Sequence, residues 1–595
     1  MSDEQRNTVW RFAIIFIFIS IGFLIVLGKI FHIQTAERSE WMKIAEKQVP
    51  TRHAIKATRG NILDCNGLLL ASSMPQYYIY MDTRVPALHE QDGKLFKANI
   101  DTLCGDLARI IGDYSVQEYR RLINNAYRKN EKRLKLSKKR INYLQRSELE
   151  ANSLIRLGKY KSGIFFEDQH RRIKPYDLLA SRTIGNINSE EGVGTVGLEK
   201  SFEKELHGID GISNLQRIGG RNELVTIKEA QNGLDIVTTI DINLQDIVEN
   251  TLQNKLQERN AQWGCCILME TQTGYIRAIA NLDKGSDGLY YETSNHAVQR
   301  VEPGSTFKTI ALVAALNDDK IEIDDTVSVT KKSWVYLGRS KHTDTHRMDT
   351  TLSVRSALAV SSNIALAKLI TRSYDGSASD FIQCLERMGL RDSIYCEIPG
   401  AEKARIEIPQ NDKVTLSKMS YGYSVEMSPM QIAMFYNAIA NNGKMMRPML
   451  VTAIQKEGET VKQFKPSVVK SSICDAETLQ GIKEALHDVV WDNKLGTATI
   501  SKAQSTLVSI AGKTGTAQLY TPGEGYTDKK HRISFVGFFP EENPAYTCIC
   551  VIENPQRPFD SGRDCGGVVR IIAEKTMAHY GYYVYDEEGK RLEKK

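Results

Sequence analysis

A serine and a lysine three positions apart could form a nucleophile and its base. Ser305 and Lys308 lie where Pro303 and Gly304 precede a strongly helical pattern. A serine hydroxyl needs a base at neutral pH, and positions i and i+3 of a helix face the same side. A buried lysine loses its proton more readily, and a helix N-terminus stabilises the oxyanion formed when a carbonyl is attacked. Taken alone, this pattern more often marks an N-capping serine followed by a surface lysine.

A second polar group interrupts an apolar helical run. Ser361, Ser362 and Asn363 stand in LSVRSALAVSSNIALAKLI. One interpretation is a helix break or cap. The other is that Ser361 relays a proton and Asn363 holds an amide of the substrate.

A third group, Lys513-Thr514-Gly515-Thr516, lies in a segment with a strand pattern. Gly515 has no side chain, so an extended substrate could lie against the backbone there. Lys513 and the hydroxyls of Thr514 and Thr516 could bind a carboxylate. A polar end of an edge strand is the simpler interpretation of this group alone.

The three groups become specific as a set. They occur in the order Ser-x-x-Lys, Ser-x-Asn and Lys-Thr-Gly, and their first residues are 56 and 152 positions apart. This order is typical of penicillin-binding proteins and class A β-lactamases, although Ser362 stands where the latter carry Asp. Wider phrases such as VEPGSTFK (301–308), YGYSVEMSPMQIA (421–433), GTA (496–498) and SFVGFFP (534–540) agree. The chain resembles the class B penicillin-binding proteins, which are single-span D,D-transpeptidases of bacterial cell-wall synthesis.

The N-terminal half carries three phrases that resemble the family's pedestal motifs. They are ATRGNILDCNGLLLA (57–71), RRIKPYDLLASRTIG (171–185) and GTVGLEKSFEKELHGIDG (194–211). Cys65 stands where the family usually has Arg, and Lys174 where it usually has Tyr. These departures concern the contacts of the pedestal rather than the chemistry.

The resemblance implies a reaction and its partners. Ser305 would attack the penultimate D-alanine of a stem peptide and release the last D-alanine. An amine from a neighbouring stem peptide would then take the acyl group, with no metal or organic cofactor. The implied partners are stem peptides, a lipid-linked precursor, β-lactams, the cytoplasmic membrane, a glycan polymerase and division proteins, without nucleic acid.

Several alternatives remain open at this point. The phrases at 301–308 and 421–433 resemble the division (FtsI) type more than the elongation type. A serine β-lactamase would be under half as long and would need a group that activates water. A β-lactam sensor would show several spans and a His-Glu-x-x-His motif, and this sequence has neither.

The elements that must position these residues indicate an α+β fold. Two strands are expected over 264–281, helices over 305–317, 352–371, 475–490 and 567–580, and late strands over 507–518, 532–539 and 546–553. Strands at both ends of a unit with helices between them favour one antiparallel sheet covered by helices. The last two strands are close enough to form an antiparallel hairpin.

An uncharged run at the N-terminus predicts a membrane anchor. Residues 12–28 carry no charge, and snorkelling of Lys29 and His32 extends the run to residue 33. No signal-peptidase site follows the run. Because the substrate lies outside the cytoplasmic membrane, we expect the catalytic mass on the outer, periplasmic side. The expected division is a cytoplasmic tail (1–11), an anchor (12–33), a pedestal (34–235), a transpeptidase domain (236–585) and a polar tail (586–595).

Composition excludes several other classes. The net charge of +6 is small for 595 residues and gives no general nucleic-acid signature. Ten cysteines form no Cys-x-x-Cys pair and no dense disulfide pattern. Eight basic residues among the thirteen at 128–140, with no aromatic residues interleaved in the nearby sequence, predict a solvated surface element.

Overall fold

The computed structural model describes residues 3–38, 52–188, 192–218, 221–345, 350–409, 412–521, 523, 525–580, 584–585 and 591–592. These residues form two compact units, one made of 1–57 and 209–231, the other of 58–208 and 232–595. Of the polar tail expected over 586–595, the structure describes β24 (Arg591–Leu592), which pairs with β23 (Val584–Tyr585) just before the tail, and the rest of the tail lies outside the described residues.

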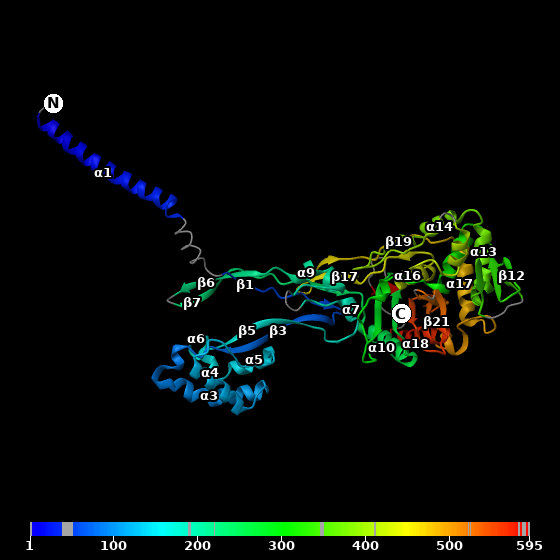
Figure 1. The fold of residues 1–595 in the computed structure, drawn as a ribbon, viewed down its shortest axis with the longest axis horizontal. Coiled ribbons are helices and arrows are strands. Elements are labelled where there is room, and N and C mark those ends of the chain that lie inside the picture. The colour runs from blue at the N-terminus through cyan, green and yellow to red at the C-terminus, as the bar shows by residue number, and fades with distance from the viewer. Residues whose placement is uncertain are drawn as a thin grey trace. The chain divides into compact units, whose positions relative to one another are not determined.

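The first unit contains one long helix and a small sheet (Figure 1). The helix α1 spans Asp3–Thr35, and its part Ile14–Thr35 is long and apolar enough to cross a membrane, with none of it buried. This apolar part overlaps the anchor expected over 12–33. The antiparallel sheet has the order β1-β6-β7, with the bounds β1 Arg52–Ile55, β6 Gly211–Ile218 and β7 Arg221–Lys228.

The second unit is built around a six-stranded antiparallel sheet that carries the Lys-Thr-Gly motif, Lys513–Thr516, on its edge strand. The order is β11-β10-β9-β22-β21-β20, which confirms the expected antiparallel sheet with strands from both ends of the domain. The expected hairpin of the last strands is also present, since Phe539 pairs with Tyr546. The bounds are β9 Trp263–Glu270, β10 Ile276–Lys284, β11 Tyr290–Tyr291, β20 Ala511–Thr521, β21 Gly525–Phe539 and β22 Tyr546–Glu553.

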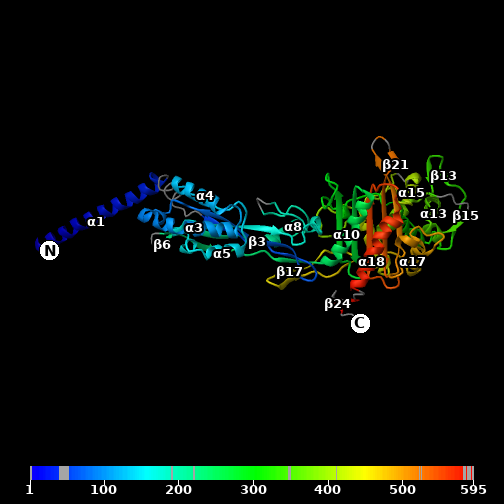
Figure 2. The ribbon, with the colours of Figure 1, turned by 90° about the horizontal axis from the view of Figure 1, so that it is seen from below.

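Helices cover both faces of this sheet because its central strands are apolar on both sides. Every residue of β9 is buried, and its side chains alternate between two cores. One core lies under α10 (Ile242–Arg259) and α18 (Gly567–Tyr580), which lie side by side in Figure 2. Four cysteines share this core, and the sulfurs of Cys266 and Cys548 are 3.7 Å apart.

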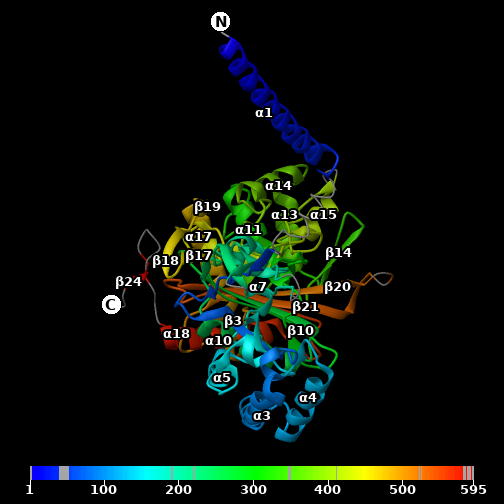
Figure 3. The same ribbon diagram turned by 90° about the vertical axis from the view of Figure 1, so that its left-hand side faces the viewer.

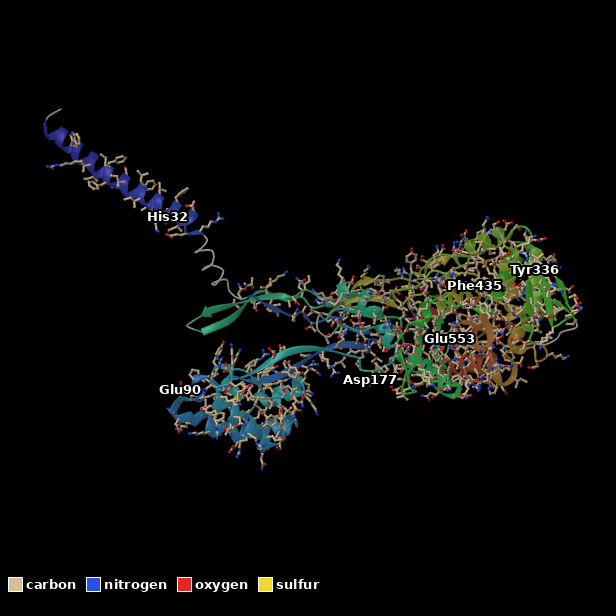
Figure 4. The ribbon with its side chains drawn as sticks, viewed as in Figure 1. His32, Glu90, Asp177, Tyr336, Phe435 and Glu553 are labelled. Carbon is tan, nitrogen blue, oxygen red and sulfur yellow. The ribbon has the colours of Figure 1, made fainter. Side chains whose placement is uncertain are left out.

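The other core surrounds the helix α11 (Phe307–Asn317), whose residues 307–316 are all buried. Figure 4 shows Phe435, from the neighbouring α16 (Pro429–Ala440), inside this part of the molecule. The remaining helices here are α12 Val354–Ala359, α13 Asn363–Ser373, α14 Ala378–Arg387, α15 Lys413–Met419 and α17 Ala476–Trp491. Two-stranded sheets complete it, made of β12 Thr326–Val329 with β15 Thr350–Ser353, β13 Ser333–Tyr336 with β14 Ser340–Thr343, and β16 Met445–Met446 with β19 Val468–Lys470.

One expected helix is divided in two. The sequence predicts a helix over 352–371, but α12 ends at Ala359 and α13 begins at Asn363. Ser361 between them has φ of +57°, a left-handed conformation that no helix accommodates. The hydroxyl of Ser362 then caps α13 by accepting a hydrogen bond from the Ala365 amide at 3.0 Å. The break interpretation of the Ser-Ser-Asn group is therefore confirmed.

A long mixed sheet joins the N-terminal half of this unit to the half that contains the six-stranded sheet. Its order is β18-β17-β8-β2-β3-β4, with β5 along β3. The bounds are β2 Ile62–Leu63, β3 Leu69–Met81, β4 Leu134–Lys135, β5 Ile164–Ile173, β8 Asp235–Thr238, β17 Val451–Lys456 and β18 Glu459–Gln463. We call β4, the C-terminal half of β3 and β5 the head sheet.

Helices pack on one face of the head sheet (Figure 3). Tyr77, Ile79 and Met81 of β3 are buried against them, while the alternate side chains point to the opposite face. The helices are α3 Glu90–Ile110, α4 Val116–Lys129 and α5 Tyr143–Glu150, and the shorter α6 Lys159–Ser162, α7 Ser181–Ile184, α8 Gly197–Ser201 and α9 Glu203–His207 lie along the connections.

The three pedestal phrases meet at one buried carboxylate. Glu199 is fully buried, and its two oxygens accept hydrogen bonds from Arg59 (2.7 Å) and Arg172 (2.6 Å), one from each of the other phrases. Such a carboxylate is strongly destabilising if either partner is removed. At the departures from the family pattern, Lys174 bonds to Asn186 at 2.8 Å, and burial raises the pKa of the Cys65 thiol to about 12.

Candidate active site

Ser305 lies in a tight turn that leads into α11. Residues Gly304–Thr306 form a single 3-10 turn before the helix begins at Phe307. Gly304 has φ of +57°, and a Cβ placed there would lie 2.9 Å from the carbonyl oxygen of Thr516 on β20. Glycine therefore allows the turn to approach the edge strand, and the first motif faces the third.

Hydrogen bonds from Tyr436 of α16 hold the turn in place. The hydroxyl of Tyr436, which is fully buried, donates to the carbonyl oxygen of Thr306 at 2.9 Å and lies 2.7 Å from Oγ1 of Thr309. Because buried polar groups cost free energy unless they are paired, these bonds fix the start of α11 against α16. Ser305 itself remains partly exposed.

The side chain of Lys308 is completely buried beside the second motif. Its Nζ donates to the carbonyl oxygen of Ser361 at 2.5 Å and to the hydroxyl of Ser361 at 3.0 Å. Burial lowers the pKa of Lys308 to about 7, while the negative charge of Asp344 acts in the opposite direction. The sequence predicts that Lys308 reaches Ser305; among the described residues, the hydrogen bonds of Lys308 go to Ser361.

Asp344 organises the second motif, and sequence reasoning missed it. Its carboxylate accepts hydrogen bonds from the hydroxyl of Ser362 (2.7 Å) and from the amides of Asn363 (2.6 Å) and Ile364 (3.2 Å). A carboxylate at the first turn of a helix is favourable because free amides and the helix dipole both attract it. No motif marks Asp344 in the sequence, since it follows β14 and reaches α13 only through the fold.

Asn363 is positioned by Thr343 and Asp344, at the end of β14. Its Nδ2 donates to the carbonyl oxygen of Thr343 at 2.9 Å. That bond fixes the plane of the side-chain amide and orients its Oδ1. The arrangement leaves a hydrogen-bond acceptor at the start of α13, on the same turn as Ser361.

The Lys-Thr-Gly motif lies on the edge strand β20, as expected. Lys513 is fully buried, and its Nζ donates to the carbonyl oxygen (3.1 Å) and hydroxyl (3.2 Å) of Thr514. Burial and the neighbouring charge of Lys308 hold the pKa of Lys513 well below its ordinary value. Thr514 is itself buried and bonds to Thr497 at 2.8 Å. Thr516 is the exposed hydroxyl of the motif.

Gly515 allows the strand to lie close to the nucleophile turn. A Cβ there would lie 2.2 Å from Oγ of Ser534 on β21 and 3.0 Å from Cγ2 of Thr306. Any larger residue would therefore push β20 away from the first turn of α11. Packing against Ser534 and Thr306 therefore requires glycine at position 515, independently of any contact with a ligand.

An aromatic rim extends away from the second motif. His342 lies 2.9 Å from the hydroxyl of Tyr421, and its ring packs against Trp334, next to Tyr336 (labelled in Figure 4). Burial and the charge of Lys418 lower the pKa of His342 to about 4, so this ring is neutral near pH 7.

Comparisons with known proteins agree with this architecture. Residues 264–578 match the penicillin binding protein transpeptidase domain, and residues 54–238 match the penicillin-binding protein dimerisation domain. The probable peptidoglycan D,D-transpeptidase PbpC of Pseudomonas aeruginosa is 26% identical over 576 residues, covering 94% of this chain and 92% of that protein. The peptidoglycan D,D-transpeptidase FtsI of Escherichia coli is 24% identical over 590 residues, covering 95% and 90%.

A solved structure shares the fold. Penicillin-binding protein 2X of Streptococcus thermophilus superposes with a TM-score of 0.74 at 21% identity, over 89% of this chain and 80% of that one. The family match covers more than half of the chain, and the three motifs converge on one site. The chain therefore belongs to the penicillin-binding protein family, in the class B arrangement of a dimerisation domain followed by a transpeptidase domain.

Proposed function

We propose that this protein is a peptidoglycan D,D-transpeptidase that cross-links stem peptides through a serine acyl-enzyme in septal wall synthesis. The observation that carries the proposal is the buried amine of Lys308, one helical turn after Ser305 and bonded to Ser361. With a pKa of about 7, this amine is partly neutral at physiological pH and can accept a proton. The FtsI and PbpC relatives carry the same activity in their names.

In acylation, Oγ of Ser305 bonds to the carbonyl carbon of the penultimate D-alanine while its proton passes to Nζ of Lys308. Amides at the first turn of α11 stabilise the oxyanion. The C–N bond to the terminal D-alanine then breaks, and the leaving amine receives a proton through the hydroxyl of Ser361. In transfer, the amine of a second stem peptide attacks the ester carbon, its proton passes back through the same groups, and the bond to Ser305 breaks.

The remaining motif residues bind the substrate. Asn363 offers its Oδ1 to an amide N–H of the stem peptide. The stem peptide lies along β20 at Gly515, and Thr516 hydrogen-bonds its terminal carboxylate. Lys513 and Thr514 are buried on the same strand, so they orient the carboxylate-binding end of the site rather than offer a wide contact surface.

The localisation and division of the chain are part of the same proposal. The apolar part of α1 anchors the protein in the cytoplasmic membrane, and the mass after residue 34 lies on the periplasmic side, where the substrate is. We assign 1–11 to a cytoplasmic tail, 12–33 to the anchor, 34–235 to the pedestal, 236–585 to catalysis and 586–595 to a polar tail. A glycan polymerase, a lipid-linked precursor and division proteins are the expected partners.

Labelling with a fluorescent penicillin tests the nucleophile. Intact-mass and peptide mapping should give one adduct on the peptide that contains Ser305, and Ser305→Ala should give none. An adduct elsewhere, or a labelled Ser305→Ala protein, would overturn the assignment.

A chromogenic cephalosporin in excess separates transpeptidase from β-lactamase. Both acylate a serine, but a β-lactamase holds a water against the ester. We expect one stoichiometric burst followed by almost no turnover. Sustained turnover of many equivalents per second would favour the β-lactamase.

Depletion of this protein from the cells that produce it tests the septal role. Filamentous cells would indicate a role in division, and rounded cells would indicate a role in elongation.

A further inference from the structure

The face of the head sheet away from its helices carries a ladder of aromatic rings under cations. Nζ of Lys135 lies 3.6 Å from the ring centre of Tyr78, and Nζ of Lys159 lies 4.6 Å from that of Phe165. The guanidinium of Arg133 lies 4.6 Å from the ring centre of Tyr80. The eight basic side chains at 128–140 are exposed, which confirms the expected solvated surface element. Lys135 and Arg133 of this run also lie over rings of β3, which is far from the run in the sequence.

This face has an excess of positive charge. Of the eight basic residues at 128–140, only Arg133 forms an ion pair within the part of the chain that the structure describes, with Glu167 at 2.7 Å. Lys135 and Arg140 lie over Tyr78 and Lys159 lies over Phe165, and these cation–π contacts hold the three charges near the sheet without neutralising them. The face is thus an array of positioned cations that lacks enough carboxylates of its own.

The same sheet offers a free edge. The strand β5 pairs with β3 along its whole length, Ile164–Ile173. Among the described residues, its backbone between Phe165 and Asp168 makes no hydrogen bond on the side away from β3. An unpaired edge of this length is a template for an added strand.

We propose that the head sheet is a docking site for an extended, acidic segment of a partner protein, which adds to β5 as a further strand. The charge of the face calls for carboxylates. The free edge calls for a polypeptide, because only a polypeptide presents N–H and C=O groups at the spacing of a β-ladder. Neither a lipid headgroup nor an acidic polysaccharide satisfies both features.

The register places the charges within reach of one another. Phe165 faces Tyr80 across the β3–β5 pair, so both rings lie on the cationic face. A strand added beside β5 would lie about 4.8 Å away. Its alternate side chains would project onto the same face, next to Phe165. A glutamate at that position meets Lys159, and a neighbouring glutamate can share Arg133 with Glu167.

The test uses the full-length protein in zwitterionic nanodiscs and a fluorescein-labelled twelve-residue peptide of alternating Glu and Thr. We expect saturable binding by fluorescence anisotropy. The variant Lys135→Glu with Lys159→Glu should raise the Kd at least tenfold. The matched control Lys456→Glu with Lys465→Glu reverses two exposed charges outside the head sheet and should leave the Kd unchanged. Both variants should label normally with fluorescent penicillin, which verifies their folding independently of docking.

The backbone requirement is tested on the peptide rather than on the protein. Two peptides of unchanged charge, N-methylated at either the odd or the even positions, remove the amide donors of one edge at a time. One of them should bind at least tenfold more weakly than the other. Equal binding of the two, or no binding of the parent peptide, would overturn strand addition.

Competition identifies the class of partner. An excess of polygalacturonate or of phosphatidylglycerol vesicles should displace the peptide less effectively than unlabelled peptide at equal negative charge. Displacement by either at equal or lower charge concentration would show that the face binds an acidic polysaccharide or a membrane, and would refute the polypeptide.

Discussion

Lys308 and Ser361 are 53 positions apart in the chain, and Nζ of the lysine lies 3.0 Å from the hydroxyl of the serine. The lysine is on a fully buried helix, and the serine is at the break between α12 and α13. The left-handed conformation of Ser361 directs both its carbonyl oxygen and its hydroxyl to one amine. A buried amine with two oxygen acceptors can hold or release a proton without exposure to bulk water.

The pH dependence of acylation should report this amine. Only neutral Lys308 can accept the proton of Ser305, and the neutral fraction increases as the pH rises through the lysine pKa of about 7. We expect the rate of penicillin acylation to rise about tenfold per pH unit below this value and to level off above it. Stopped-flow measurements between pH 5 and 9 check the profile. A flat profile across this range would contradict the base role.

Removal of the amine should block chemistry without unfolding the protein. Lys308→Ala should acylate at least ~10²-fold more slowly, the usual size of a general-base effect. Circular dichroism should show native secondary structure. The control Lys320→Ala removes a lysine just beyond the end of α11 and should acylate at the wild-type rate. Near wild-type acylation of Lys308→Ala would refute the assignment.

Asp344→Asn should shift the pH profile as well as the rate. The charge of Asp344 raises the pKa of Lys308, so its removal should lower that pKa and move the midpoint of the profile to lower pH. The plateau rate should also fall, because the bond to the hydroxyl of Ser362 is lost. The control Asp324→Asn should change neither quantity. A reduced rate with an unmoved midpoint would indicate that Asp344 acts only on the turn.

Gly515→Ala should reduce both stability and acylation. The new Cβ would lie 2.2 Å from Oγ of Ser534, and such overpacking typically costs about 1–3 kcal/mol. Thermal unfolding and labelling rates measure the two effects. The double variant with Ser534→Ala should recover part of the loss, while Gly567→Ala, where a Cβ meets nothing within 4 Å, should be tolerated. A double variant no better than the single one would place the strain elsewhere.

The topology should be visible by proteolysis. With a single uncleaved anchor and an outside catalytic domain, protease added to spheroplasts should digest the chain beyond about residue 34. Anti-tag blots at both ends follow the products, and a cytoplasmic marker verifies that the membrane is intact. Protection of the C-terminal part would reverse the proposed orientation.

Local patterns predicted the parts of the site that depend on local structure. Pro303 and Gly304 before an apolar helix place Ser305 at a helix start, and the strand pattern around Gly515 places the third motif on a strand. The antiparallel sheet followed from strands at both ends of the domain. These features depend on backbone propensity and periodicity, which neighbouring residues determine.

Other features depend on contacts between distant segments. The left-handed Ser361 divided a helix that the apolar periodicity predicts to be continuous, because serine carries no marker for that conformation. Asp344 reaches α13 through the fold, and the aromatic partner of Lys135 is Tyr78 of β3. Pattern reasoning finds such pairs only where a known family supplies the spacing, as it did for the three motifs.

The position of β20 makes the two walls of the active site mechanically unequal. The wall that carries Ser305 belongs to a helix enclosed in the core and clamped by Tyr436. The opposite wall is a strand laddered on one side only, to β21. On the side away from β21, the amide of Gln518 on β20 donates to the hydroxyl of Tyr423 at 2.9 Å. We therefore expect a bulky ligand to displace β20 around Thr516 rather than α11 and Ser305.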